Sequence, residues 1–222
     1  MNKYIKVCSI IVLMIFSFYY TEKVAIYVQN NTPLKKEIIS YKDSNTVKYV
    51  NAEVVGDYIV PGINGLSVNV NKSYNKMKSY NIFNENYLVY DQVKPQISLS
   101  NFKDKIIHKG NSQKNGVSIL INSSNEYFNK NNITYDLTNK TNYCIKTNND
   151  DCTNTFKQIV EPTLILNNQN FLKNVGLITK GSIIYISDDL NVNYIYALVN
   201  HIKYNNYNIY KLNDHLSENN IP

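Results

Sequence analysis

The stretch GSIIYISDDLNVNYIYALVNHIKYNNYNIYKL, residues 181–212, decides the fold of this chain. Its first six residues form an apolar run with the length of a buried strand. An amphipathic helix is predicted over 193–204, where one helical stripe holds Ile195, Leu198, Val199 and Ile202. A turn at 205–208 and a short strand at 209–212 follow. A strand, a helix and a strand in this order predict a right-handed βαβ unit with parallel strands.

Two apolar runs of similar length lie upstream, GVSILI at 116–121 and TLIL at 163–166. Residues 124–135, between these runs, are polar and weakly patterned. We therefore expect residues 101–222 to form one α/β domain whose sheet is built on such runs. The tail at 214–218 is expected to be a frayed end.

The N-terminus carries an export signal, because Lys3 and Lys6 precede the uncharged apolar run VCSIIVLMIFSFYY at 7–20. No small-x-small cleavage site follows, which favours an uncleaved signal anchor over 1–23 rather than a cleaved peptide. A buried core helix is the third interpretation. By the positive-inside rule, the two lysines keep the N-terminus cytoplasmic. We thus expect a single-pass protein of the cell membrane whose C-terminal part is extracellular.

Residues 24–100 are expected to form a small α+β module next to the membrane. Pro33 interrupts a helical pattern that continues out of the anchor, so the helix should break there. The expected elements are, in order, a helix over 22–43 that breaks near 31–33, a strand within 46–55, the turn VPGING at 60–65, a strand at 66–70, a helix at 73–80 and a strand at 87–90.

The composition argues against a nucleic-acid partner. The chain has 222 residues and a formal net charge of +6 at pH 7, and its lysines are scattered singly or in short pairs such as Lys35–Lys36. A nucleic-acid-binding protein is expected to cluster its basic residues. A solvated surface explains the scatter, and attraction to an anionic lipid surface or cell-wall polymer is the alternative.

Three stretches carry a resemblance to a known family: FSFYYTEKV at 16–24, VPGINGLSVNVNKSYNKMKSYNIFNENYLVY at 60–90, and GSIIYISDD at 181–189 with the helix and tail that follow it. They resemble the anchor, the juxtamembrane module and the last strand and helix of membrane-anchored polysaccharide deacetylase-like (NodB-homology) proteins from low-GC Gram-positive bacteria. The resemblance covers most of the chain, with a gap in the middle. It implies that residues 101–222 are a truncated deacetylase-like (β/α) barrel.

The resemblance implies metal-assisted hydrolysis of an acetyl group on a glycan, but this chain lacks the residues for it. An Asp pair, one base and one ligand, is expected after the first strand, where Asn122 and Ser123 stand. Two ligands in an H-x-x-x-H motif are expected on the next helix, and the chain contains no such motif. A catalytic His is expected after a late strand, where Ser187 stands. The segment between 121 and 143 is expected to be too short for the ligand-bearing helix and a second strand.

Two pairs of residues remain as candidates. Asp188 and Asp189 follow a predicted buried strand, which is where α/β folds place ligand sites. The alternative is that they provide an N-cap and a first-turn acid for the next helix. Cys144 and Cys152, eight positions apart in a chain expected to be exported, predict a disulfide, and two free thiols are the alternative.

We therefore expect a non-catalytic envelope protein, a pseudo-deacetylase domain without a metal or other cofactor that binds cell-wall glycan or a partner protein. Exposed tyrosines would provide stacking surfaces for sugars. The first alternative is a metal-dependent polysaccharide or peptidoglycan deacetylase with relocated residues, drawn from Asp188, Asp189 and one histidine. The second is an envelope assembly factor that binds through its anchor and juxtamembrane module. No metal spacing is predicted, because the histidines are far apart: His108 in a basic loop, His201 at the helix surface and His215 in the tail.

Overall fold

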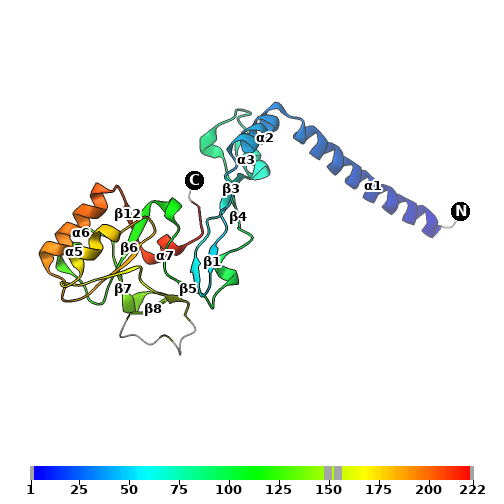
Figure 1. The fold of residues 1–222 in the computed structure, drawn as a ribbon. Helices are drawn as coiled ribbons and strands as arrows, with labels where there is room; N and C mark the ends of the chain where they lie inside the picture. The colour runs from blue at the N-terminus through cyan, green and yellow to red at the C-terminus, as the bar shows by residue number, and fades with distance from the viewer. Residues whose placement is uncertain (1–2, 148–151, 153–156, 221–222) are drawn as a thin grey trace. The chain divides into compact units, whose positions relative to one another are not determined.

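The computed structural model describes residues 3–147, 152 and 157–220 as a mixed α/β fold with an apolar helix near the N-terminus (Figure 1). The α-helices are α1 (Lys3–Asn30), α2 (Pro33–Asn45), α3 (Val70–Met77), α4 (Glu126–Lys130), α5 (Phe171–Asn174), α6 (Val192–Tyr204) and α7 (Leu212–Leu216). Short 3-10 helices are η1 (Glu85–Tyr87), η2 (Leu99–Asn101), η3 (Ser112–Lys114), η4 (Thr138–Lys140) and η5 (Val175–Leu177).

Within the described residues, the strands form three sheets. Their bounds are β1 (Glu53–Val55), β2 (Tyr58–Val60), β3 (Gly65–Val68), β4 (Tyr90–Val93), β5 (Ile106–Ile107), β6 (Gly116–Ile121), β7 (Asp136–Leu137), β8 (Cys144–Ile145), β9 (Ile159–Val160), β10 (Leu164–Leu166), β11 (Ile183–Ile186) and β12 (Asn208–Tyr210). One sheet has the order β10-β11-β6-β12, with β7 also beside β6, and all its pairs are parallel. A second has the order β1-β2-β5-β9-β8, and β3 pairs with β4 in the third.

The chain divides into two compact units, one made of Met1–Val47 and Leu66–Gln92 and the other of Lys48–Gly65 and Val93–Ile221. This division differs from the expected boundary near residue 100. The reason is that β2 pairs in parallel with β5, which brings residues 48–65 into the second unit.

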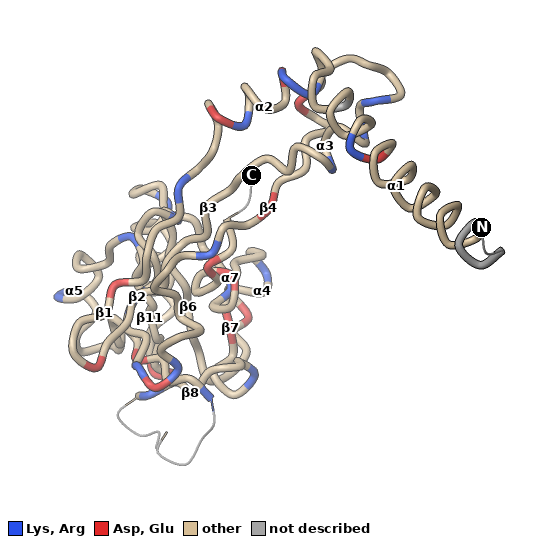
Figure 2. Tube along the Cα trace, turned by 90° about the vertical axis from the view of Figure 1, so that its right-hand side faces the viewer, with Lys and Arg blue, Asp and Glu red and all other residues tan. Residues whose placement is uncertain are grey.

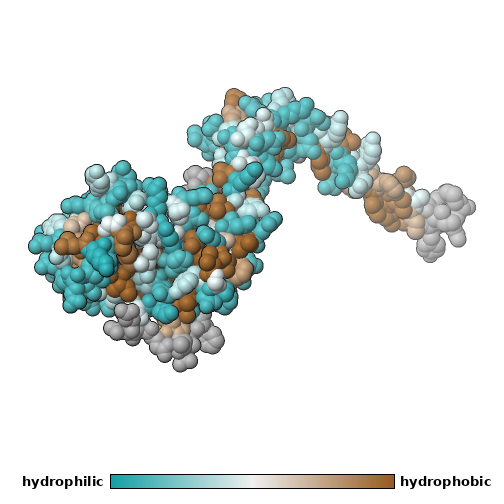
Figure 3. All heavy atoms as spheres, in the orientation of Figure 1, coloured by the Kyte–Doolittle hydropathy of each residue, from teal (hydrophilic) through white to brown (hydrophobic). Residues whose placement is uncertain are grey.

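The apolar helix α1 contains Val7–Val28, a 22-residue stretch long and apolar enough to cross a membrane. Most of the described part of α1 consists of uncharged residues (Figure 2), and apolar residues cover part of its surface (Figure 3). None of this stretch is buried inside the protein, which argues against the buried core helix considered above. A signal sequence has the same length and composition, so α1 is an anchor or a signal by this measure.

Side-chain caps fix the helices of the first unit. α1 ends at Asn30 and α2 begins at Pro33, which confirms the predicted break. The Thr32 hydroxyl accepts a hydrogen bond from the Lys35 N–H at 3.4 Å. Asn69 caps α3 by accepting from the Lys72 N–H at 2.9 Å, so this helix starts three residues earlier than predicted and the strand before it ends earlier. The core of this unit contains Leu34, Ile38, Val68, Met77 and Leu88.

Two expected strands of the N-terminal half are shifted or shortened. The strand predicted at 87–90 lies at 90–93, because Asn84 accepts from the Asn86 N–H and starts η1 instead. The strand predicted within 46–55 is reduced to β1, and upstream of it Val47 and Val50 form isolated bridges.

The central strand β6 is buried along its whole length, which explains why its sequence is a continuous apolar run. Its alternate side chains enter two different cores. One core, on the side of α4, α5 and α6, contains Val117, Ile119, Ile121, Phe128, Phe171, Leu198, Val199 and Ile202. The other, which includes residues of the second sheet and of α7, contains Leu120, Ile59, Ile107, Ile145, Val160, Leu212 and Leu216.

Two expectations for the second unit are wrong in detail, and one weakly patterned segment is folded. The segment 124–135 contains α4, whose Phe128 is buried, and β7 follows and pairs with β6. The segment between 121 and 143 thus holds a helix of five residues, EYFNK, and a strand of two residues, and this helix carries no histidine. The strand predicted at 209–212 ends at Tyr210, and the tail forms α7 because Leu212 and Leu216 are buried.

Candidate functional site: the carboxyl edge of the parallel sheet

The two neighbouring strands β6 and β11 end at the same level, since Ile121 pairs with Ile186 in parallel register. Asn122 and Ser123 follow the first strand, and Ser187 follows the second. The three positions where the family resemblance would require catalytic residues therefore lie at one edge of one sheet. Loops at the carboxyl ends of parallel strands are where α/β folds form ligand sites.

A small cavity opens at this edge. Its volume is about 50 Å³, and its polar lining residues are Ser123, Asn125, Ser187 and Asp188. Apolar side chains of Ile121, Ile186, Leu190 and Ile195 complete the lining. One water molecule takes up about 30 Å³ of liquid, whereas pockets for drug-sized ligands measure roughly 300–1,000 Å³. The cavity thus has room for water but not for a sugar ring.

Amide side chains at the edge are engaged in local structure. The Oδ1 atom of Asn122 accepts a hydrogen bond from the Thr138 hydroxyl at 2.9 Å, which links the ends of β6 and β7. Asn125 caps α4, accepting from the Tyr127 N–H at 3.0 Å and the Phe128 N–H at 3.4 Å. A neutral amide cannot take a proton from water as a carboxylate does, so Asn122 provides no general base.

The carboxylates of Asp188 and Asp189 are exposed, and neither caps α6. The cap is Asn191, which accepts from the Asn193 N–H at 2.9 Å, so the N-cap interpretation of the pair is wrong. Asn168 holds this loop against the end of β10: its amide nitrogen donates to the Asp189 carbonyl, and its oxygen accepts from the Asn191 N–H at 2.8 Å. Within the part of the chain that the structure describes, no cluster of three or more His, Cys, Asp or Glu side chains is placed to hold a metal ion.

His215 was expected in the tail, but it is fully buried in α7. Its Nδ1 atom lies 2.7 Å from the hydroxyl of Ser118, which is also fully buried in the middle of β6. Burial, with a smaller contribution from the positive charge of Lys114, lowers the pKa of His215 to about 4. A Ser–His pair at this distance resembles a nucleophile with its base. With both side chains out of contact with solvent, however, it is a structural contact.

The sequence contains a signal for the burial of His215. Leu212 and Leu216 are four residues apart, which is the spacing of one helical face, and His215 lies beside Leu216 on it. His201 is partly exposed on α6. His108 follows β5, and its ring meets the Tyr58 ring edge-on, with the two ring centroids 5.0 Å apart.

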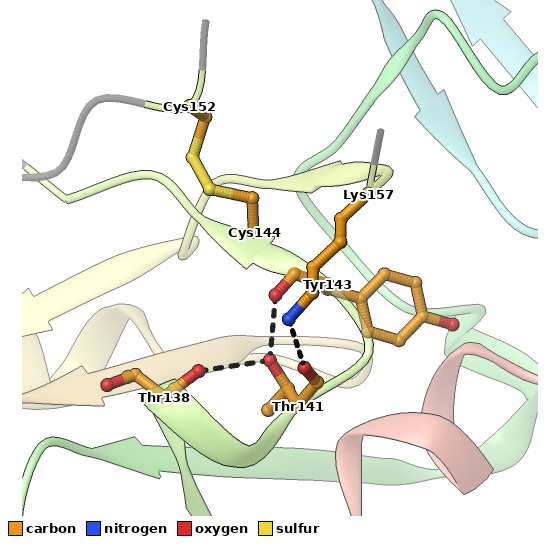
Figure 4. The surroundings of a disulfide bond; sticks show 6 residues. All are labelled: Thr138, Thr141, Tyr143, Cys144, Cys152 and Lys157. Atoms are coloured by element: carbon orange, nitrogen blue, oxygen red, sulfur yellow. Dashed lines mark hydrogen bonds between the residues drawn. A yellow bond between two sulfur atoms is a disulfide. The ribbon is translucent and has the colours of Figure 1, made fainter. Parts of the chain in front are cut away.

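Cys144 and Cys152 form a disulfide in the structure (Figure 4). Cys144 lies in β8, which pairs in parallel with β9, and Cys152 is buried. The segment before the disulfide is fixed by Thr141, whose hydroxyl donates to the Tyr143 carbonyl at 2.9 Å. The Lys157 ammonium group donates to the Thr141 carbonyl at 3.0 Å, which ties both ends of the loop together.

The fold resembles that of the CE4 family of polysaccharide deacetylase-like domains, as the sequence predicted. The wild-type CE4 family pseudoenzyme from Bacillus anthracis superposes with a TM-score of 0.51 at 15% identity, over 85% of this chain and 96% of that chain. A mutant of that pseudoenzyme with restored enzymatic activity gives a TM-score of 0.50 at 16% identity, over 85% and 99% of the two chains. At such identities the likeness concerns the fold alone.

A sequence relative is the uncharacterized protein YlxY of Bacillus subtilis (strain 168), which is 42% identical over 103 residues. The match covers 44% of this chain and 32% of the relative, so the chain spans about a third of the length of the curated relative that it matches. No family model matches the sequence.

Proposed function

We propose that this protein is a non-catalytic, deacetylase-like protein of the cell envelope, held in the cell membrane by α1 with the rest of the chain outside. The two lysines before the apolar stretch support this orientation. The parallel strands and the fold likeness support the further proposal that the second unit is a shortened (β/α) barrel.

The observation that carries the proposal is the set of neutral side chains at the carboxyl edge, where Asn122, Ser123 and Ser187 stand at the expected catalytic positions. A hydrolase of acetylated glycans has to admit the acetyl group and the attacking water between a base and an electrophile. At this edge Ser123 and Ser187 occupy two of the three expected catalytic positions. They provide neither a base nor a metal ligand of the type that the chemistry requires.

An active hydrolase with relocated residues would need Asp188, Asp189 and a histidine at one site. His215 is buried and unavailable. His201 lies ten residues along α6 from its cap Asn191, which corresponds to about 15 Å of helix. This separation argues against the alternative.

Acetate release from peptidoglycan and acetylated chito-oligosaccharides, measured with the full chain in detergent and added zinc or cobalt, tests the proposal. We expect no release above that of the Asp188→Asn variant. Release by the wild-type chain that Asp188→Asn abolishes would contradict the proposal and favour the active hydrolase.

We further propose that the retained role is binding of cell-wall glycan or of an envelope protein. An aromatic pair on α4 and α6 favours the glycan: the Tyr127 and Tyr196 ring centroids lie 4.3 Å apart, and Tyr196 is 49% exposed. Aromatic faces of this kind stack on sugar rings. Tyr196→Ala should weaken sedimentation with peptidoglycan several-fold, whereas Tyr204→Ala, a change at a more exposed site of the same helix, should not. Equal binding of both variants would exclude the aromatic pair as the glycan site.

A further inference from the structure

Only a short segment separates the apolar stretch of α1 from the folded part of the first unit. The stretch ends at Val28 and α2 begins at Pro33. Five residue steps span at most about 17 Å even when fully extended. If α1 crosses a bilayer, as proposed above, the start of α2 must lie within that distance of the hydrocarbon region.

The same unit exposes a group of large apolar side chains in residues 78–88, which we name the tyrosine–isoleucine turn. Ile82 is 69% exposed, Tyr80 68% and Tyr87 43%. Their neighbours in sequence point the other way, since Met77 and Leu88 are buried in the core of the unit. The turn thus has an inner face that packs and an outer apolar face that does not.

The outer face is held in place by ordered backbone and ring contacts. The N–H groups of Tyr80 and Asn81 both donate to the Met77 carbonyl at 3.0 Å, and Asn81 adopts a left-handed conformation with φ of 49°. The Tyr80 and Tyr87 rings are stacked, with centroids 6.3 Å apart. Phe83 anchors the turn on α2, with its ring 5.5 Å from that of Tyr41. The exposed side chains are therefore presented by a preformed surface.

The lysines beside the turn suit an anionic lipid surface. Exposed Lys76 and Lys78 lie at the end of α3 and just after it, whereas Lys72 is paired with Asp91 at 3.3 Å. Glu85, in η1, is the one acidic residue within the turn itself. Tyrosines flanked by lysines are typical of the membrane–water interface, where the rings lie at headgroup level and lysines extend toward phosphates. An exposed isoleucine between them adds an apolar group that can reach the acyl chains.

We propose that the tyrosine–isoleucine turn inserts into the interfacial layer of the bilayer that α1 crosses, with Ile82 and Tyr80 among the lipids and Lys76 and Lys78 at the headgroups. The proposal rests on α1 spanning the membrane. The turn would give the first unit a second attachment to the lipid surface and so restrict how the chain swings about the end of α1.

The absence of tryptophan from the chain permits a direct test. The full chain is reconstituted in nanodiscs of anionic lipid, with and without brominated acyl chains, as three single-tryptophan variants. Ile82→Trp reports on the turn, Phe16→Trp on α1, and Tyr204→Trp, at a site 87% exposed on α6, on the second unit. We expect bromolipid to quench Ile82→Trp at least twofold with a blue-shifted emission, to quench Phe16→Trp as well, and to leave Tyr204→Trp unchanged.

The Phe16→Trp variant distinguishes failure of the inference about the turn from failure of the proposed membrane anchor. Quenching of Phe16→Trp without quenching of Ile82→Trp would overturn the inference and leave the anchor intact. No quenching of Phe16→Trp would contradict the anchor and the inference together. Tyr80→Trp serves as a second reporter on the turn if Ile82→Trp does not fold, and the same expectations apply to it.

Discussion

His215 lies in a fully buried site where protonation is opposed by burial and by the positive charge of Lys114. Ser118 contacts one ring nitrogen, and the Tyr210 ring stacks on the imidazole with centroids 6.0 Å apart. The site therefore favours the neutral imidazole, and folding stability depends on the charge of this side chain.

Because the pKa of His215 falls to about 4 in the folded protein, the unfolded chain binds the proton first. The contribution to stability is constant above pH 6.5, decreases as the pH falls from there toward 4, and levels off below. The full loss is about 3 kcal/mol. Urea unfolding between pH 7 and 4 should show this decrease in the wild-type chain, and His215→Gln should lack that part of it. Identical pH profiles for the two chains would contradict the assignment.

Gly110 packs directly on the same imidazole. A Cβ atom at Gly110 would lie 2.3 Å from the Nε2 atom of His215, so an alanine forces the helix or the loop to move. We expect Gly110→Ala to destabilise the second unit by about 1–3 kcal/mol. Gly176→Ala is the matched control, since a Cβ there meets nothing within 4 Å and should change stability by less than about 0.5 kcal/mol. Equal urea midpoints for both variants would show that the packing is looser than described.

At the scale of elements, the disulfide closes a short loop between β8 and the start of β9. Loop closure in the unfolded chain should contribute about 2–3 kcal/mol to stability. A reducing agent should therefore lower the urea midpoint of the wild-type chain and leave that of a Cys144→Ser/Cys152→Ser chain unchanged. An unchanged wild-type midpoint under reduction would indicate that these thiols are free in the protein.

The sequence predicts best the elements that carry a long apolar run or a long amphipathic stripe. β6 and β11 are apolar on both faces, and α6 has a clear stripe, so their positions are right within one or two residues. Strands of two residues such as β5, β8 and β9 carry no detectable period, and only pairing with distant neighbours defines them. α3 and β4 begin at other residues than predicted, because Asn69 and Asn84 act as helix caps. These caps are hard to recognise in the sequence, since Asn is so abundant in this chain.

At the scale of the whole molecule, the sequence predicts which residues follow the buried strands, but it does not predict the cavity that they line. The parallel pairing of β6 with β11 brings Asn122, Ser123 and Ser187 to one edge, and this pairing is seen only in the structure. The size of the cavity depends on side chains of α6 and of the loop at 187–191, which only the folded structure brings together. The buried contact of His215 was missed for the same reason, because it joins residues 97 positions apart.

Zinc content tests most directly the proposal that this edge holds no catalytic metal. The full chain is purified with excess zinc, desalted, and measured for bound metal beside an Asp188→Asn/Asp189→Asn chain. We predict that the wild-type chain retains no more zinc than the double variant. One zinc per wild-type chain, lost in the double variant, would contradict the account and identify the relocated site of an active hydrolase.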